Sequence, residues 1–135
     1  MFRKYANARR KPADDKGDGG FLTGIWQGYR NSLPGGGPEM RLKVLIPTIM
    51  AAARPYDAHH ACGRYEIRPR LGLIKSPTLL MSGSRDLMLN ELESTKSIIP
   101  RCRTQVIQGG GIYIGLEYPK EFAKAVDDFM KNPQV

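Results

Sequence analysis

The sequence predicts an α/β protein, in which a helical N-terminal half (residues 1–72) precedes a β-α-β-α unit (residues 73–135). Apolar residues in the first half recur at helical spacing, whereas two short apolar runs in the second half, 77–82 and 103–107, have the length of buried strands. A helix-length segment separates these two runs, which is the order of a parallel strand pair with a crossover helix. The chain has 135 residues, 41% of them hydrophobic, enough for one modest domain with a core.

Three helices are expected in the first half. Residues 21–29 place apolar side chains on one helical face, after a segment rich in aspartate and glycine that favours turns. A second helix is expected over about 38–54, because it starts with a proline suited to a first turn, and Pro47 inside it should kink or split it. A third helix fits residues 56–67, and Pro69 is expected to end it.

The second half alternates between strands and helices. The run at 77–82 is apolar throughout, as in a fully buried parallel strand, and a helix over 89–99 follows it and stops at Pro100. The second strand, 103–107, is closed by three glycines. A last helix begins after Pro119 and carries apolar residues on one face.

Two segments of this half resemble the α/β-hydrolase family. Residues 65–86, YEIRPRLGLIKSPTLLMSGSRD, are similar to the segment with which these proteins leave the cap domain and enter the penultimate core strand. Residues 99–129, IPRCRTQVIQGGGIYIGLEYPKEFAKAVDDF, resemble the last strand, the following loop and the closing helix. The helical first half looks similar to the cap region. The resemblance therefore implies a partial α/β-hydrolase fold: a cap-like region, 1–72, and a C-terminal core segment, 73–135.

The resemblance also implies a catalytic triad of nucleophile, acid and histidine. Asp86 matches the position of the acid in many members, since it follows Gly83 by three residues at the expected carboxyl end of a strand. A carboxylate there can hold an imidazole in the right tautomer. A solvated loop aspartate or a helix N-cap explains the same residue equally well.

The other two triad roles have no candidate. Members of the family carry the histidine after the glycines that follow the last strand, and here that position is Ile112, which cannot accept a proton. The run 112–114 is expected to form a buried wall instead. No Gly-x-Ser-x-Gly or Gly-x-Asp-x-Gly occurs, and a chain that begins in the cap region lacks the strands that supply the nucleophile and the oxyanion hole. The family chemistry, hydrolysis of a small ester or similar apolar substrate, is therefore not expected of this chain alone.

No cofactor and no metal site are expected. His59 and His60, the only histidines, are adjacent and point in different directions on a helix, so they cannot easily share an ion even with Asp57 and Cys62 nearby. The three glycines at 109–111 lack the helix start and the Lys-Ser/Thr of a phosphate loop. The two cysteines are far apart and form no Cys-x-x-Cys pair, which argues against a disulfide scaffold.

The net charge of +8 and a basic cluster near the N-terminus raise nucleic acid as a partner. The other basic residues are scattered and no aromatic residues alternate with them, so nucleic-acid binding is not expected. No apolar stretch approaches the roughly 20 residues that span a bilayer, and the basic start has neither a signal-peptide core nor the serines of a transit peptide. We therefore expect a soluble, cytoplasmic protein with no membrane partner.

Two functions remain open. The chain is either a truncated or diverged copy of a hydrolase, or a non-enzymatic binding module that uses the same scaffold to contact a partner. With only two expected strands, one side of the pair exposes unpaired backbone groups and apolar side chains. We therefore expect a homodimer, or association with a missing N-terminal portion.

Overall fold

The computed structural model describes residues 16–33, 35–51 and 57–133. Within them, a set of helices precedes a two-stranded parallel sheet with its own helices, which confirms the predicted α/β class. The division into a cap-like region and a core segment stays a prediction. In chain order the elements are α2 (Gly20–Ser32), α3 (Pro38–Ala51), α4 (Asp57–Arg64), α5 (Arg68–Leu71), β1 (Thr78–Gly83), the 3-10 turn η1 (Leu89–Glu91), α6 (Leu92–Lys96), β2 (Cys102–Ile107), α7 (Ile114–Glu117) and α8 (Pro119–Lys131).

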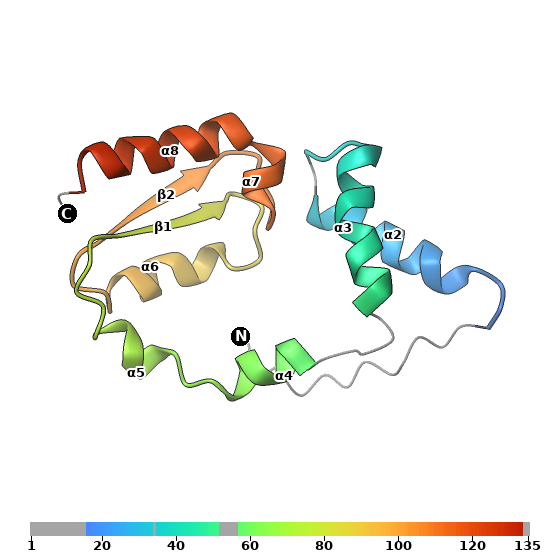
Figure 1. The fold of residues 1–135 in the computed structure, drawn as a ribbon, viewed down its shortest axis with the longest axis horizontal. Helices are drawn as coiled ribbons and strands as arrows, with labels where there is room; N and C mark the ends of the chain where they lie inside the picture. Colours follow the sequence, from blue (N-terminus) through green and yellow to red (C-terminus); the bar gives the residue numbers. More distant parts are fainter. Residues whose placement is uncertain (1–15, 34, 52–56, 134–135) are drawn as a thin grey trace.

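The sheet confirms the predicted strand pair. β1 and β2 run parallel, with Thr78 opposite Cys102 at one end and Gly83 opposite Ile107 at the other. The crossover between them contains η1 and α6, as a parallel pair requires. Figure 1 shows α8 on one side of the two strands and α6 on the other.

Successive residues of β2 contact different helices because side chains alternate along a strand. The guanidinium of Arg103 lies 5.0 Å from the ring centroid of Phe129 on α8. The hydroxyl of its neighbour Thr104 donates to the carboxylate of Glu93, just after the start of α6, at 3.3 Å. The last helix has a half-buried apolar face, as its spacing predicts. Both helices therefore cover β2.

The helices α2 and α3 pack against each other as a hairpin. The hydroxyls of Tyr29 and Thr48 join the two helices by a hydrogen bond, and Thr48 also donates to the carbonyl of Val44 at 3.0 Å. Leu33, in the connection, is fully buried. Pro47 was expected to kink or split this helix, and a split is wrong because α3 continues through Pro47.

Two helix boundaries differ from the sequence prediction. Pro69 was expected to end a helix, but it lies in the first turn of α5, where a missing N–H costs nothing. The crossover helix, expected over 89–99, is α-helical only from Leu92 to Lys96. Ser94 and Ser97 bond backbone carbonyls three residues earlier, and such local bonds compete with a regular helix.

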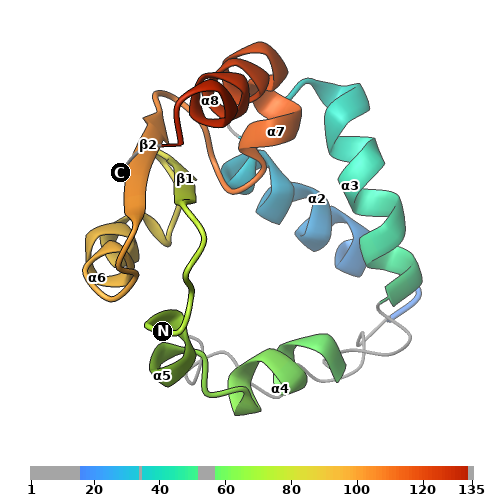
Figure 2. The ribbon, with the colours of Figure 1, turned by 60° about the vertical axis from the view of Figure 1, so that its left-hand side comes forward.

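The hydrophobic core of the described residues is small. Its buried apolar side chains are Leu33, Leu45, Ile99, Cys102 and Ile107. Figure 2 shows the α2–α3 hairpin and the sheet on opposite sides of α7. None of the described helices is long and apolar enough to cross a membrane.

Candidate functional site

The loops after the two strands interlock at the carboxyl edge of the sheet. Arg85 donates its backbone N–H to the carbonyl of Gly110 at 2.9 Å, and Gly109 donates to the hydroxyl of Ser84 at 2.9 Å. Gly83 lies so close that a Cβ on it would be 2.2 Å from the carbonyl oxygen of Gly110. Gly109 has a φ of +79°, a conformation that glycine adopts without strain. The glycines therefore serve a tight backbone contact that positions both loops.

Asp86 is half-buried in the first of these loops. One of its carboxylate oxygens accepts a hydrogen bond from the N–H of Met88 at 2.8 Å, and its carbonyl accepts from Leu89 at 3.1 Å. The carboxylate thus holds the turn between β1 and η1, whose own N-cap residue is Met88 and makes no side-chain cap bond. This hydrogen bond uses one carboxylate oxygen of Asp86, and the second oxygen can accept another hydrogen bond.

Ile112 follows the glycine loop at the same edge of the sheet and is 54% exposed. The expectation that 112–114 forms a buried wall is therefore wrong at its first residue, while Tyr113 and Ile114 are half-buried. The reason is that the chain turns into α7 directly after the loop, so these residues do not continue a strand. The side chain of Ile112 offers no proton acceptor.

His59 and His60 belong to α4, and their side chains lie outside what the structure describes. Cys62 on the same helix is exposed, Cys102 on β2 is buried, and both are free thiols. Burial raises the pKa of Cys102 above its ordinary value. Among the described residues, no group of three or more histidine, cysteine, aspartate or glutamate side chains is placed to hold a metal ion.

Glu117, to which the sequence assigned no role, is the residue that ties the helical part to the glycine loop. One carboxylate oxygen accepts from the N–H of Gly35 at 2.9 Å, and the other accepts from the N–H of Gly111 at 2.7 Å. Both are charge-assisted bonds, which are stronger than neutral ones. The local sequence gives no signal for this role, except that Glu117 is the one acidic residue after the apolar residues 112–116.

Two tyrosines form a second contact between the hairpin and the glycine loop. The rings of Tyr29 on α2 and Tyr113 before α7 have centroids 6.4 Å apart. Burial, and secondarily the neighbouring Tyr29, raises the pKa of Tyr113 to about 12. A phenol that holds its proton this firmly cannot act as a base near neutral pH.

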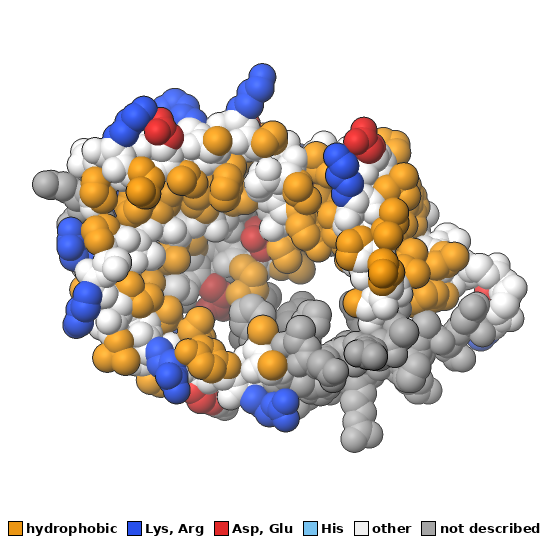
Figure 3. Space-filling model, in the orientation of Figure 1, with side chains coloured by type: hydrophobic (Ala, Val, Ile, Leu, Met, Phe, Trp, Pro, Cys, Tyr) orange, Lys and Arg blue, Asp and Glu red, His pale blue; other side chains and the backbone are white. Residues whose placement is uncertain are grey.

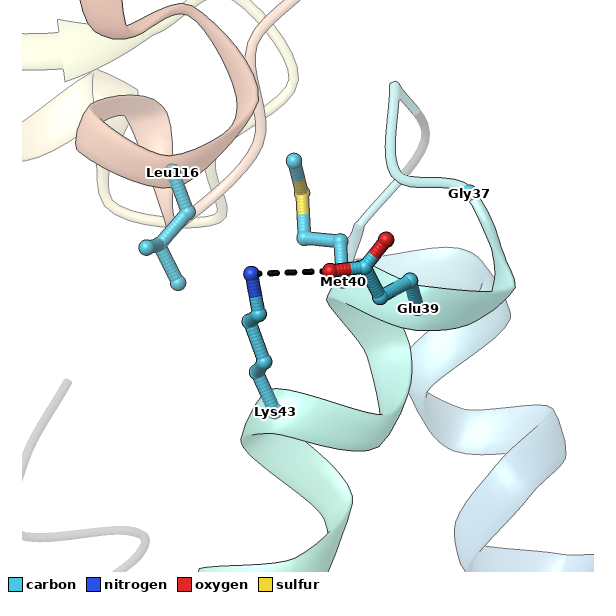
Figure 4. Close-up of a pocket in the computed structure, with 5 residues that line it drawn as sticks. All are labelled: Gly37, Glu39, Met40, Lys43 and Leu116. Carbon is cyan, nitrogen blue, oxygen red and sulfur yellow. Dashed lines mark ion pairs between the residues drawn. The ribbon is translucent and has the colours of Figure 1, made fainter.

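A shallow pocket lies between the start of α3 and α7 (Figure 4). Met40 and Leu116 give it an apolar character, and Gly37 forms part of its rim. The ammonium of Lys43 and the carboxylate of Glu39 pair at 3.1 Å along α3, and both side chains are largely exposed. Solvent-exposed pairs of this kind contribute little to stability. The only ionisable side chains that line the pocket are therefore the paired Glu39 and Lys43.

The sequence matches no described protein family, and no curated protein matches it. Its fold, in contrast, is similar to solved structures. MenH from S. aureus shares 25% identity with a TM-score of 0.65, over 97% of this chain and 52% of that chain. Est816, an N-acyl homoserine lactone degrading enzyme, shares 20% identity with a TM-score of 0.61, over 96% and 54%.

Proline iminopeptidase from Mycobacterium smegmatis shares 20% identity with a TM-score of 0.63, over 97% of this chain and 48% of that chain. All three proteins have the α/β-hydrolase fold. The chain spans about half the length of these structures. The chain therefore has the part of the α/β-hydrolase fold that corresponds to about half of each of these structures.

Proposed function

We propose that this chain is a hydrolase scaffold with no hydrolytic activity of its own. The observation that carries the proposal is Ile112, a hydrocarbon side chain that follows the glycine loop where the resemblance requires the catalytic histidine. An acyl transfer needs a base to take the proton of the nucleophile, and isoleucine cannot supply one. The sequence also contains no Gly-x-Ser-x-Gly elbow to present a nucleophile.

Two structural relatives support the proposed substrate class. They are described as a lactone-degrading enzyme and an iminopeptidase, which supports hydrolysis of a small ester or similar apolar substrate as the chemistry of a full-length relative. The family resemblance implies that, in an active member, the residue at the position of Asp86 orients the histidine. In this chain the carboxylate of Asp86 holds a turn, and the position that the resemblance assigns to the histidine is Ile112.

The test is the hydrolysis of p-nitrophenyl acetate by the purified chain. We expect the rate of the buffer alone, for the chain and for its Asp86→Ala variant. Ile112→His should also stay at the buffer rate, because a base without a nucleophile and an oxyanion hole completes no triad. Turnover that disappears on Asp86→Ala would show that an unforeseen nucleophile exists, and would overturn the proposal.

A second candidate is a binding module on the same scaffold. Exposed apolar side chains favour it, since Ile112 and Leu116 are 54% and 44% exposed beside the glycine loop and the pocket. The genomic DNA immediately upstream separates the two candidates. An open reading frame that encodes a Gly-x-Ser-x-Gly elbow favours a truncated hydrolase, and its absence favours the binding module.

A further inference from the structure

Among the buried side-chain nitrogens and oxygens of the described residues, only the Nε of Arg41 on α3 has no hydrogen-bond partner. A buried N–H donor without an acceptor is costly, because it loses its hydrogen bond to water and gains no other. Native structures usually satisfy such a group with a protein atom, a water molecule or a ligand. The side chain of Arg41 is only half-buried as a whole, so a small ligand can still reach it.

Two described acids near Arg41 are already engaged elsewhere. Glu39 is two residues earlier, but residues two apart do not face each other on a helix, and its carboxylate pairs with Lys43 at 3.1 Å. Glu117, which contacts the connection between α2 and α3, uses both of its oxygens on backbone N–H groups. The ion pairs between described residues all use lysine as the cation. Within the described part of the chain, Arg41 is therefore a cation without a counter-ion.

The α2–α3 hairpin fixes the position of Arg41. Its backbone N–H donates to the carbonyl of Gly37 at 3.1 Å, and Leu45, one turn further on the same face of α3, is buried. The guanidinium carbon of Arg41 lies 6.0 Å from the ring centroid of Trp26 on α2. This cation–π contact holds the guanidinium but offers no oxygen that its N–H groups can donate to. The donors are therefore in place before a ligand binds.

An apolar surface adjoins this cation. Leu22 lies one turn before Trp26 on the same face of α2 and is 48% exposed. Figure 3 shows hydrophobic side chains gathered over the α2–α3 hairpin. Such a surface favours the hydrocarbon part of a ligand, whereas the guanidinium favours its negative group. Lys43, the neighbouring cation on α3, is already paired with Glu39, so the site offers one positive charge.

We propose that Arg41 and Trp26 form a binding site for a monocarboxylate with a short apolar chain. The carboxylate oxygens accept hydrogen bonds from the Nε and one Nη of Arg41, because the edge of a guanidinium matches a carboxylate in a bidentate pair. The apolar chain lies against Trp26 and Leu22. A carboxylate fits better than a phosphate, since one guanidinium balances its single negative charge. The proposal concerns binding and is independent of whether the chain hydrolyses esters.

The test uses the fluorescence of Trp26, the only tryptophan of the chain. The full chain is titrated with sodium hexanoate at constant ionic strength, and in parallel with 1-hexanol and with inorganic phosphate. We expect a saturable change in emission with hexanoate, with one site per chain. Hexanol has the same hydrocarbon chain without the charge and should bind about tenfold more weakly, because the charge-assisted pair is lost. Phosphate should leave the emission unchanged.

Two substitutions of Arg41 and one control identify the site. Arg41→Gln removes the charge and should weaken hexanoate binding by about tenfold, whereas Arg41→Lys keeps the charge without the Nε donor and should weaken it by about threefold. Arg30→Gln makes the same change in net charge at an exposed position of α2 and should leave the affinity unchanged. If circular dichroism shows that the Arg41 variants do not fold, the Nε–H signal of Arg41 in the NMR spectrum of the unsubstituted chain decides the question, because it should shift when hexanoate binds.

Four results would overturn the proposal. They are the absence of a saturable change in emission with hexanoate, equal affinities for hexanoate and 1-hexanol, unchanged hexanoate binding by Arg41→Gln, and a change with phosphate equal to that with hexanoate. A chain that binds hexanoate through Arg41 and also hydrolyses esters would contradict only the proposed function.

Discussion

Replacement of Gly83 by alanine tests whether the interlocked loops hold the site together. A Cβ at this position would lie 2.2 Å from the carbonyl oxygen of Gly110, 2.4 Å from its carbonyl carbon and 2.6 Å from the carbonyl oxygen of Gly111. All three are backbone atoms, so no side-chain rotation relieves the overlap, and the glycine loop has to move.

The cost follows from two contributions. Overpacking that forces backbone shifts typically costs about 1–3 kcal/mol, and an overlap with three backbone atoms belongs at the upper end of that range. Moving Gly110 also weakens the hydrogen bond that it accepts from Arg85, which contributes about 1 kcal/mol. We therefore expect Gly83→Ala to lower the free energy of unfolding by about 3–4 kcal/mol.

Urea unfolding followed by circular dichroism measures this change. Gly24→Ala is the matched control, because a Cβ there meets nothing within 4 Å and the residue lies inside α2. An alanine in a helix interior is more favourable than glycine by about 1 kcal/mol, so this control should be slightly stabilised. If Gly83→Ala were within about 1 kcal/mol of the parent chain, the close approach of the two loops would not exist in solution.

Three further substitutions test individual contacts. Glu117→Gln leaves one of two backbone N–H groups without its carboxylate oxygen, and should lower the free energy of unfolding, measured in urea, by about 1–3 kcal/mol. An unchanged unfolding midpoint would contradict the two hydrogen bonds of Glu117. The folded-state pKa of Tyr113 is raised to about 12. Its contribution to the free energy of unfolding is therefore present below about pH 10 and is lost as the pH rises to about 12. Tyr113→Phe should remove this loss and the highest step in the phenolate absorbance titration; retention of that step would refute the assignment. The pKa of Asp128 is lowered chiefly by its hydrogen bond with Lys124, so Lys124→Met should raise it in an NMR titration, with little change in stability because both groups are exposed.

Elements with a strong local signal were predictable from the sequence. The strand around Leu80 is an uninterrupted apolar run, and helix α8 begins with a proline and has apolar residues at regular helical spacing. The parallel pairing followed from the spacing between the two strands. The role of Pro69 was predicted wrongly because proline disfavours the continuation of a helix but also fits the first turn of one, and the sequence alone does not distinguish these roles.

The contacts between distant segments were not predictable. The bond between Glu117 and Gly35 joins residues 82 positions apart, and neither residue type carries a local signal for it. The exposure of Ile112 likewise depends on the turn into α7, which is only four residues long. The position of Asp86 after β1 was expected, but the sequence does not show that its carboxylate accepts from the N–H of Met88 within the loop.

The absence of an activated nucleophile is the central claim, and covalent labelling tests it without knowledge of the substrate. The purified chain is incubated with a fluorophosphonate, which reacts with serines that an adjacent base activates. We predict an unchanged intact mass, since no serine stands in an elbow and the position after the glycine loop is Ile112. One adduct per chain on a single serine, lost on Asp86→Ala, would contradict the account.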